Sequence, residues 1–184
     1  MPAPSILPLP PEDARIAVIG LGYVGLPLAV AFGAVRPVTG FDVDARRVAE
    51  LDSGMDRTRE LDAEEIAVAA HLRFSNDPRE LAACDIFIVA VPTPIDAGHN
   101  PDLGPLREAS ALVARAMRRG ALVIYESTVY PGTTEEICVP ILEQGSGLRF
   151  GIDFSCGYSP ERVSPGDRQR RLAGMPNITA RSSS

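Results

Sequence analysis

The stretch IAVIGLGYVGLPLAVAF, residues 16–32, decides the fold of this chain. A short apolar run leads directly into Gly20, Gly22 and Gly25, which have the spacing Gly-x-Gly-x-x-Gly, and a helix-like apolar segment follows. The first glycine permits a tight turn, the second lets the backbone approach a pyrophosphate, and the third lets a helix pack closely on a strand. Free N–H groups at the start of such a helix favour phosphate oxygens. These residues therefore predict a strand, a phosphate-binding loop and a helix.

From Arg15 onward, short β-branched runs alternate with longer helix-like runs, a pattern typical of a parallel sheet covered by helices. The six predicted strands lie at residues 16–19, 38–41, 72–74, 86–91, 122–125 and 154–158. Helices are expected at residues 24–32, 45–52, 63–70, 78–83, 105–118 and 134–143. The predicted fold class is therefore α/β: a single Rossmann-type dinucleotide-binding domain with a doubly wound, mostly parallel sheet.

The second predicted strand ends at Asp42, on the edge of the sheet where ligands bind. We expect its carboxylate to accept hydrogen bonds from the adenosine ribose hydroxyls. Its negative charge favours NAD, because it would repel the 2′-phosphate of NADP. Arg46 and Arg47 lie close in the sequence, so NADP stays an alternative. We predict that the cofactor is NAD and that Arg47 belongs to its site.

Charge and hydropathy exclude several classes of partner. The net charge is −6 and the dense basic stretch is confined to residues 168–171, so we expect no nucleic-acid partner. No apolar run approaches the roughly 20 residues of a membrane helix, so we expect no membrane partner and a cytoplasmic protein. The cysteines, Cys84, Cys138 and Cys156, are odd in number and widely spaced. They are expected to be reduced, buried thiols, and no metal site is predicted.

Five motifs resemble the N-terminal domain of the UDP-glucose/GDP-mannose dehydrogenase family. They are GLGYVGLPLA (20–29), FDVD (41–44), VPTP (91–94), YESTVYPG (125–132) and YSPER (158–162). Three longer stretches look most like the enzymes that act on UDP-N-acetylhexosamines for surface polysaccharide synthesis: VPTPID (91–96), PDL (101–103) and SPERVSPG (159–166). The resemblance implies oxidation of the sugar C6 alcohol to an aldehyde and then to a carboxylate, with two NAD consumed.

Carried over residue by residue, the resemblance implies a cofactor site built from three segments that follow predicted strands. The residues from Val91 to Thr93 are expected to line its nicotinamide side, with Ser127 and Thr128 beside them. The predicted cofactor-binding residues are Gly20, Gly22, Tyr23, Val24, Gly25, Asp42, Arg47, Val91, Pro92, Thr93, Ser127 and Thr128.

Two catalytic residues are implied by the same resemblance. Thr128 resembles the family threonine that helps to hold the water used in proton transfer, with a turn or cap hydroxyl as the alternative. Glu161 resembles the active-site glutamate that takes part in acid/base catalysis or thioester hydrolysis. The alternative is that it forms a surface ion pair with Arg162. Alternation along the strand favours an orientation of Glu126 away from the pocket.

The domain limits follow from these segments. We expect a disordered leader over residues 1–14, the NAD-binding Rossmann domain over 15–172 and a frayed tail over 173–184. Family members continue into a connecting helix with a catalytic lysine and asparagine, and into a UDP-binding domain with a nucleophilic cysteine. We expect both to be absent here. Cys156 does not match that nucleophile, whose sequence context is glycine-rich, and is interpreted as a packed thiol.

Three interpretations of the chain remain. It is a truncated part of an enzyme that binds NAD without turnover, one half of an enzyme completed by another chain, or a non-catalytic dinucleotide-binding or interaction module. The expected partners are a UDP-sugar in the complete enzyme, and a second copy of the chain or a partner chain that carries the missing domain.

Overall fold

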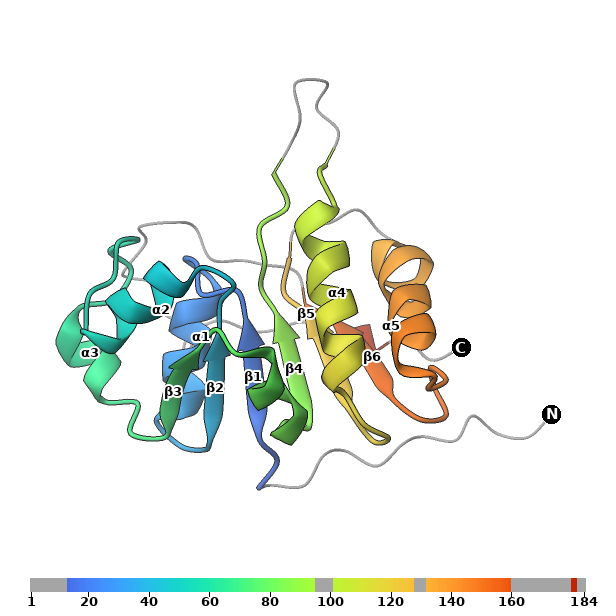
Figure 1. Ribbon diagram of the computed structural model, residues 1–184, viewed down its shortest axis with the longest axis horizontal. Helices are drawn as coiled ribbons and strands as arrows, with labels where there is room; N and C mark the ends of the chain where they lie inside the picture. Colours follow the sequence, from blue (N-terminus) through green and yellow to red (C-terminus); the bar gives the residue numbers. More distant parts are fainter. Residues whose placement is uncertain (1–12, 95–100, 128–131, 160–179, 182–184) are drawn as a thin grey trace.

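A computed structural model describes residues 13–94, 101–127, 132–159 and 180–181. Its centre is one sheet with the strand order β3-β2-β1-β4-β5-β6-β7 (Figure 1). The strands are β1 (Ile16–Ile19), β2 (Val38–Phe41), β3 (Leu72–Ser75), β4 (Ile86–Val89), β5 (Leu122–Tyr125), β6 (Ser155–Tyr158) and β7 (Ala180–Arg181). The first six pair in parallel, and β7 pairs antiparallel with β6. This order, which reverses direction next to β1, confirms the predicted doubly wound Rossmann-type fold. β7 lies in the segment that was expected to be a frayed tail.

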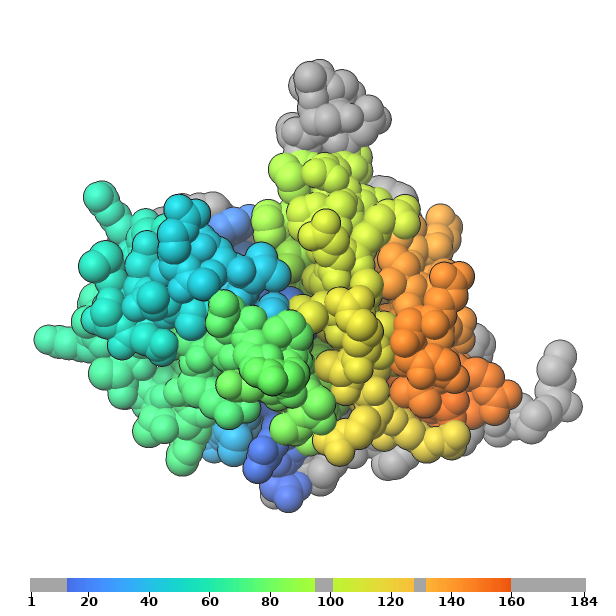
Figure 2. Space-filling view, in the orientation of Figure 1, coloured from blue at the N-terminus to red at the C-terminus, as the bar shows by residue number. Residues whose placement is uncertain are grey.

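Helical segments connect the strands and cover both faces of the sheet. They are α1 (Gly25–Gly33), α2 (Ala45–Asp52), α3 (Ala63–Ala67), the 3-10 helix η1 (Pro78–Ala83), α4 (Gly104–Ala116), the π-helix η2 (Thr134–Cys138) and α5 (Val139–Ser146). Figure 2 shows one of these faces, with α4 in yellow between η1 in green and α5 in orange. In the described part of the chain, no helix is long and apolar enough to cross a bilayer.

Each face of the sheet carries its own apolar core. Successive residues of a strand point to opposite faces, so Ala17 and Ile19 join a core beneath η1, α4 and α5, whereas Ile16 and Val18 join a core beneath α1, α2 and α3. All four of these residues are buried. A strand buried on both faces reads as a continuous apolar run, which is why β1 could be predicted with its observed limits.

Two predicted helices differ from the structure for local reasons. The helix expected at 63–70 ends at Ala67, because the next residues make short turns that lead into β3, such as Leu72 N–H to the Ala69 carbonyl at 2.9 Å. The helix expected at 134–143 begins as η2, in which the Val139 N–H donates to the carbonyl of Thr134, five residues earlier. It then continues through Pro140 as α5.

The contact between β1 and α1 generates the first prediction. A Cβ atom on Gly25 would lie 1.8 Å from the Gly20 carbonyl oxygen, whereas a Cβ atom on Gly22 would meet nothing within 4 Å. We expect Gly25→Ala to lower the free energy of unfolding by about 1–3 kcal/mol or more. The reason is that the Gly20 carbonyl can avoid the new methyl group only if α1 moves away from β1. Gly22→Ala is the matched control and should change stability by less than about 0.5 kcal/mol. Urea denaturation of both variants checks this, and equal losses of stability would contradict it.

Candidate functional site

The glycine loop lies at the carboxyl ends of β1, β2 and β4. Gly20 has a φ of 91°, which a side chain rarely adopts, and its N–H donates to the Phe41 carbonyl at 2.9 Å. Gly25 packs against Gly20 beneath the loop. Of the three glycines in the loop, Gly22 has open space where a Cβ would stand, and it lines two adjoining pockets. A ligand can therefore approach the backbone at Gly22.

The larger pocket has a volume of about 830 Å³, within the range of about 300–1,000 Å³ that is usual for small-molecule sites. One wall is the glycine loop with the ends of β2 and β4, and the other is α4. The predicted site residues in its lining are Gly20, Gly22, Asp42, Arg47, Val91 and Pro92. Its position beyond the carboxyl ends of the strands is the one at which doubly wound sheets bind their ligands.

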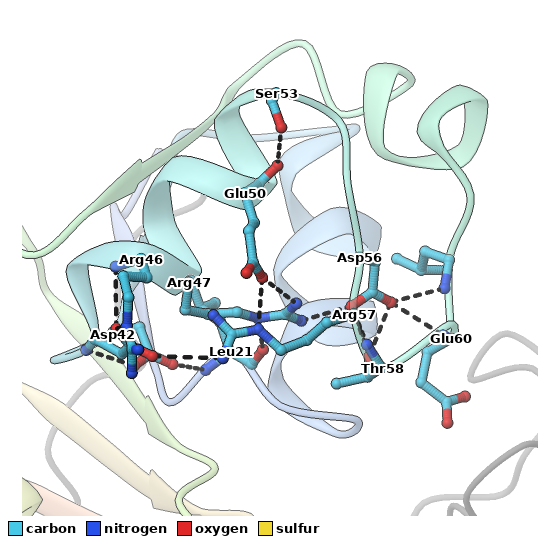
Figure 3. A network of polar contacts seen from close by, with 12 residues as sticks. Leu21, Asp42, Arg46, Arg47, Glu50, Ser53, Asp56, Arg57, Thr58 and Glu60 are labelled. Carbon is cyan, nitrogen blue, oxygen red and sulfur yellow. Dashed lines mark hydrogen bonds and ion pairs between the residues drawn. The ribbon is translucent and has the colours of Figure 1, made fainter.

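Asp42 connects the end of β2 to the glycine loop (Figure 3). Its Oδ2 accepts a hydrogen bond from the Leu21 N–H at 2.9 Å, and its Oδ1 accepts one from the Asp44 N–H at 3.0 Å. A carboxylate oxygen has a second lone pair, so each oxygen can still accept from a ribose hydroxyl. Asp42 therefore both organises the loop and offers acceptors to a ligand.

The arginines near Asp42 are paired with carboxylates, which bears on the choice between NAD and NADP. The pairs are Arg46 with Asp44 at 3.3 Å, Arg47 with Asp56 at 2.7 Å and Arg57 with Glu50 at 2.5 Å. A 2′-phosphate would have to compete with these carboxylates for a cation while it meets the charge of Asp42. The arrangement favours NAD, as the sequence predicted.

Arg47 supplies the second feature that fits a dinucleotide. Only 5% of its side chain is exposed. Its Nε donates to the Leu21 carbonyl at 2.9 Å and its Nη2 donates to Asp56 at 2.7 Å. Its buried Nη1 has no hydrogen-bond partner, and the Glu50 carboxylate is 3.9 Å away from it. Arg47 also lines the larger pocket, so its side chain borders the space in which the adenosine half of a cofactor would lie.

The second pocket has a volume of about 470 Å³ and lies where β4 and β5 end. The predicted residues in its lining are Gly22, Tyr23, Val24, Val91, Pro92 and Thr93. Ser127 lies beneath this lining: it is buried, and its Oγ donates to the Val91 carbonyl at 3.0 Å. Ser127 therefore shapes the pocket by holding the chain that leaves β4. Thr128 and Glu161 lie outside the described residues.

Glu126 also belongs to the lining of the second pocket, directly after the end of β5 at Tyr125. The orientation of its side chain away from the pocket stays a prediction. The sequence analysis missed the loop after α2, with Asp56, Arg57 and Thr58, and the wall formed by α4. Neither carries a short motif, because both reach the pocket through tertiary packing.

The three cysteines are free and buried, as predicted. Burial raises the pKa of Cys84, of Cys138 and of Cys156. A nucleophilic cysteine needs an accessible thiolate, so none of the three is set up for covalent catalysis. The interpretation of Cys156 as a packed thiol agrees with its complete burial.

Removing the negative charge of Asp42 should weaken the preference of the site for NAD over NADP. We expect Asp42→Asn to lower the ratio of the NADP and NAD dissociation constants by about tenfold, which corresponds to about 1.4 kcal/mol, because the repulsion of a 2′-phosphate is lost. Titration calorimetry with both cofactors measures the ratio. Asp85→Asn is the control, because Asp85 accepts from the Arg15 N–H at the opposite edge of the sheet. An unchanged ratio in the Asp42 variant would show that another group excludes the phosphate.

The buried thiols should resist modification in the folded chain. We expect a disulfide reagent such as 5,5′-dithiobis(2-nitrobenzoate) to label less than one equivalent of cysteine in native buffer and three equivalents in denaturant. The physical reason is that the protonated, inaccessible thiol does not attack. Rapid labelling of Cys156 in the native chain, identified by mass spectrometry, would contradict this result.

Comparisons with known proteins agree with this geometry. Residues 14–178 match the model of the UDP-glucose/GDP-mannose dehydrogenase family, NAD binding domain. The chain is 53% identical to UDP-N-acetyl-D-glucosamine 6-dehydrogenase of Pseudomonas aeruginosa and 50% identical to that of Salmonella typhi, each over 169 residues. Both alignments cover 92% of this chain and 40% of the relative.

A solved structure also resembles the chain. UDP-D-ManNAc dehydrogenase from Pyrococcus horikoshii superposes with a TM-score of 0.83 at 39% identity, covering 91% of this chain and 41% of that one. The chain thus spans about 40% of the length of the curated relatives described above. The matched region holds the glycine loop, Asp42 and the ends of β4 and β5, which confirms NAD as the cofactor. The chain belongs to the UDP-glucose/GDP-mannose dehydrogenase family and corresponds to its NAD-binding domain.

Proposed function

We propose that this chain is the NAD-binding part of a nucleotide-sugar dehydrogenase that oxidises C6 of a UDP-N-acetylhexosamine to the carboxylate, for surface polysaccharide synthesis. The observation that carries the proposal is the open backbone at Gly22, in a pocket that Asp42 and Arg47 also line, in a chain whose relatives are named for UDP-N-acetyl-D-glucosamine. Bound NAD would supply the hydride acceptor of both oxidation steps.

The residues of this chain would bind and orient the two ends of the cofactor. Asp42 and Arg47 would hold the adenosine half, and the absence of a side chain at Gly22 would admit the diphosphate. The second pocket would place the reactive end of the cofactor between Tyr23 and Thr93, beside Glu126. For the proton steps we assign Thr128 to holding a water and Glu161 to acid/base work or thioester hydrolysis, as their motifs suggest.

The covalent step requires a nucleophile from another segment or chain. The buried, protonated thiols of this chain support that view, because each would have to be uncovered before it could react. We therefore infer that a UDP-sugar is bound together with residues from outside these 184, supplied by a longer chain, a second copy or a separate chain. Free cysteines also support a cytoplasmic location, where thiols stay reduced.

Cofactor binding tests the first part of the proposal. Titration calorimetry of the 184-residue chain with NAD and NADH should show one site, and Gly22→Ala should abolish it, because the new methyl group occupies the space of the diphosphate while the fold is kept. If the wild-type chain shows no heat of binding, or if Gly22→Ala binds as well as wild type, this site is not the cofactor site.

Turnover tests the second part. UDP-N-acetylglucosamine and NAD should yield no NADH with this chain alone, and NADH formation would refute the need for an outside nucleophile. A chimaera of residues 1–172 with the remainder of the Pseudomonas relative should restore NADH formation. In that chimaera, Glu161→Gln should lower kcat by about 10²–10⁴, the usual contribution of a general acid or base. An unchanged kcat would remove Glu161 from the mechanism.

A further inference from the structure

The loop between α2 and α3 is organised around one buried carboxylate, that of Asp56, whose side chain is 0% exposed. Its Oδ1 accepts from the Thr58 N–H at 3.0 Å, and its Oδ2 accepts from the N–H groups of Glu60 at 3.0 Å and Leu61 at 3.1 Å. The Thr58 hydroxyl adds a hydrogen bond at 2.7 Å (Figure 3). Asp56 is therefore fixed by the backbone of its own loop before any partner is considered.

This fixed carboxylate meets the guanidinium that contacts the glycine loop. Arg47 donates through Nη2 to Asp56 at 2.7 Å and through Nε to the Leu21 carbonyl at 2.9 Å. The N–H of the same Leu21 donates to Asp42 at 2.9 Å. Leu21 stands between the first two glycines of the loop, so side chains from outside the loop hold both polar groups of its backbone.

We propose that Asp56 is a positioning residue for dinucleotide binding: it fixes Arg47, and Arg47 in turn holds the Leu21 peptide of the glycine loop in place. The inference rests on the proposed cofactor site. Two observations carry it: Arg47 lines the larger pocket, and its Nε and Nη2 join the glycine loop to Asp56. Because the guanidinium is planar and rigid, a partner that fixes Nη2 also fixes the direction of Nε.

Asp56 stays charged at the pH of binding. Its burial raises the pKa of the carboxyl, but the hydrogen bonds from Thr58, Arg47 and Leu61 outweigh that effect, and the pKa lies below its ordinary value of 3.8. The pair with Arg47 is therefore ionic at neutral pH. Charge-assisted hydrogen bonds are about twice as strong as neutral ones, and this one links the loop after α2 to the cofactor pocket.

The matched control is a second acidic residue with similar burial that does not line the pocket. Asp153 is 5% exposed, forms an ion pair with Arg119 at 3.0 Å and accepts from the Arg149 N–H at 2.9 Å. It precedes β6 and so lies at the edge of the sheet opposite the glycine loop. Asp56→Asn and Asp153→Asn remove equivalent charges, and thermal unfolding should show a lower Tm for both.

Binding of NADH and of ADP-ribose, measured by calorimetry, separates positioning from stability. We expect Asp56→Asn to raise the Kd of both ligands by at least about tenfold, the range of a lost hydrogen bond to a charged group, and Asp153→Asn to change neither by more than about twofold. If Asp56→Asn is unfolded by circular dichroism, Asp56→Glu, which keeps the charge but displaces it, takes its place with the same expectation. A Kd within twofold of wild type in the folded Asp56 variant overturns the proposal.

A double-mutant cycle tests whether Asp56 acts through Arg47. Arg47→Lys keeps the charge but cannot reach Leu21 and Asp56 together. We expect the double variant Asp56→Asn/Arg47→Lys to bind no more weakly than Arg47→Lys alone, because both changes break one unit. Fully additive effects would show that Asp56 acts independently and would overturn the inference. Absence of NADH binding to the wild-type chain would instead count against the proposed cofactor site itself.

Discussion

The approach of α1 to the end of β1 is the constraint on which the rest of the structure depends. The two elements lie so close that a single Cβ at Gly25 would overlap the Gly20 carbonyl. This contact brings the start of the helix beside the central strand and leaves the backbone at Gly22 open. The other walls of the pocket are formed by β2, β4 and α4. They can contact a dinucleotide only because this corner leaves room for its diphosphate.

The charged side chains around the glycine loop fix its backbone and are themselves paired. Leu21 is held through its N–H by Asp42 and through its carbonyl by Arg47, so a loop that glycines make flexible is kept rigid by its neighbours. The cost of burying Arg47 is offset by Asp56, which is itself held by backbone N–H groups. A buried charge is tolerated when it is paired and hydrogen-bonded. The same pairing keeps Arg47 from acting as a free cation for a 2′-phosphate.

Burial also decides how the cysteines behave. Cys156 lies in a strand of the central sheet, where packing excludes solvent and raises the pKa of the thiol. It serves the core between the sheet and α5 as a small apolar side chain would. The chain corresponds to the NAD-binding domain of its family and spans about 40% of the length of its curated relatives.

The sequence by itself determined the six parallel strands, the glycine loop and the choice of cofactor, because these depend on local patterns. Apolar runs buried on both faces define strands, glycine spacing defines the turn, and Asp42 follows a strand end directly. Only the tertiary structure decided that Asp56 fixes Arg47, that Ser127 lies beneath the pocket and that α4 forms its far wall. These contacts join residues that no short motif links, and their geometry arises only when the loops and helices pack on the finished sheet.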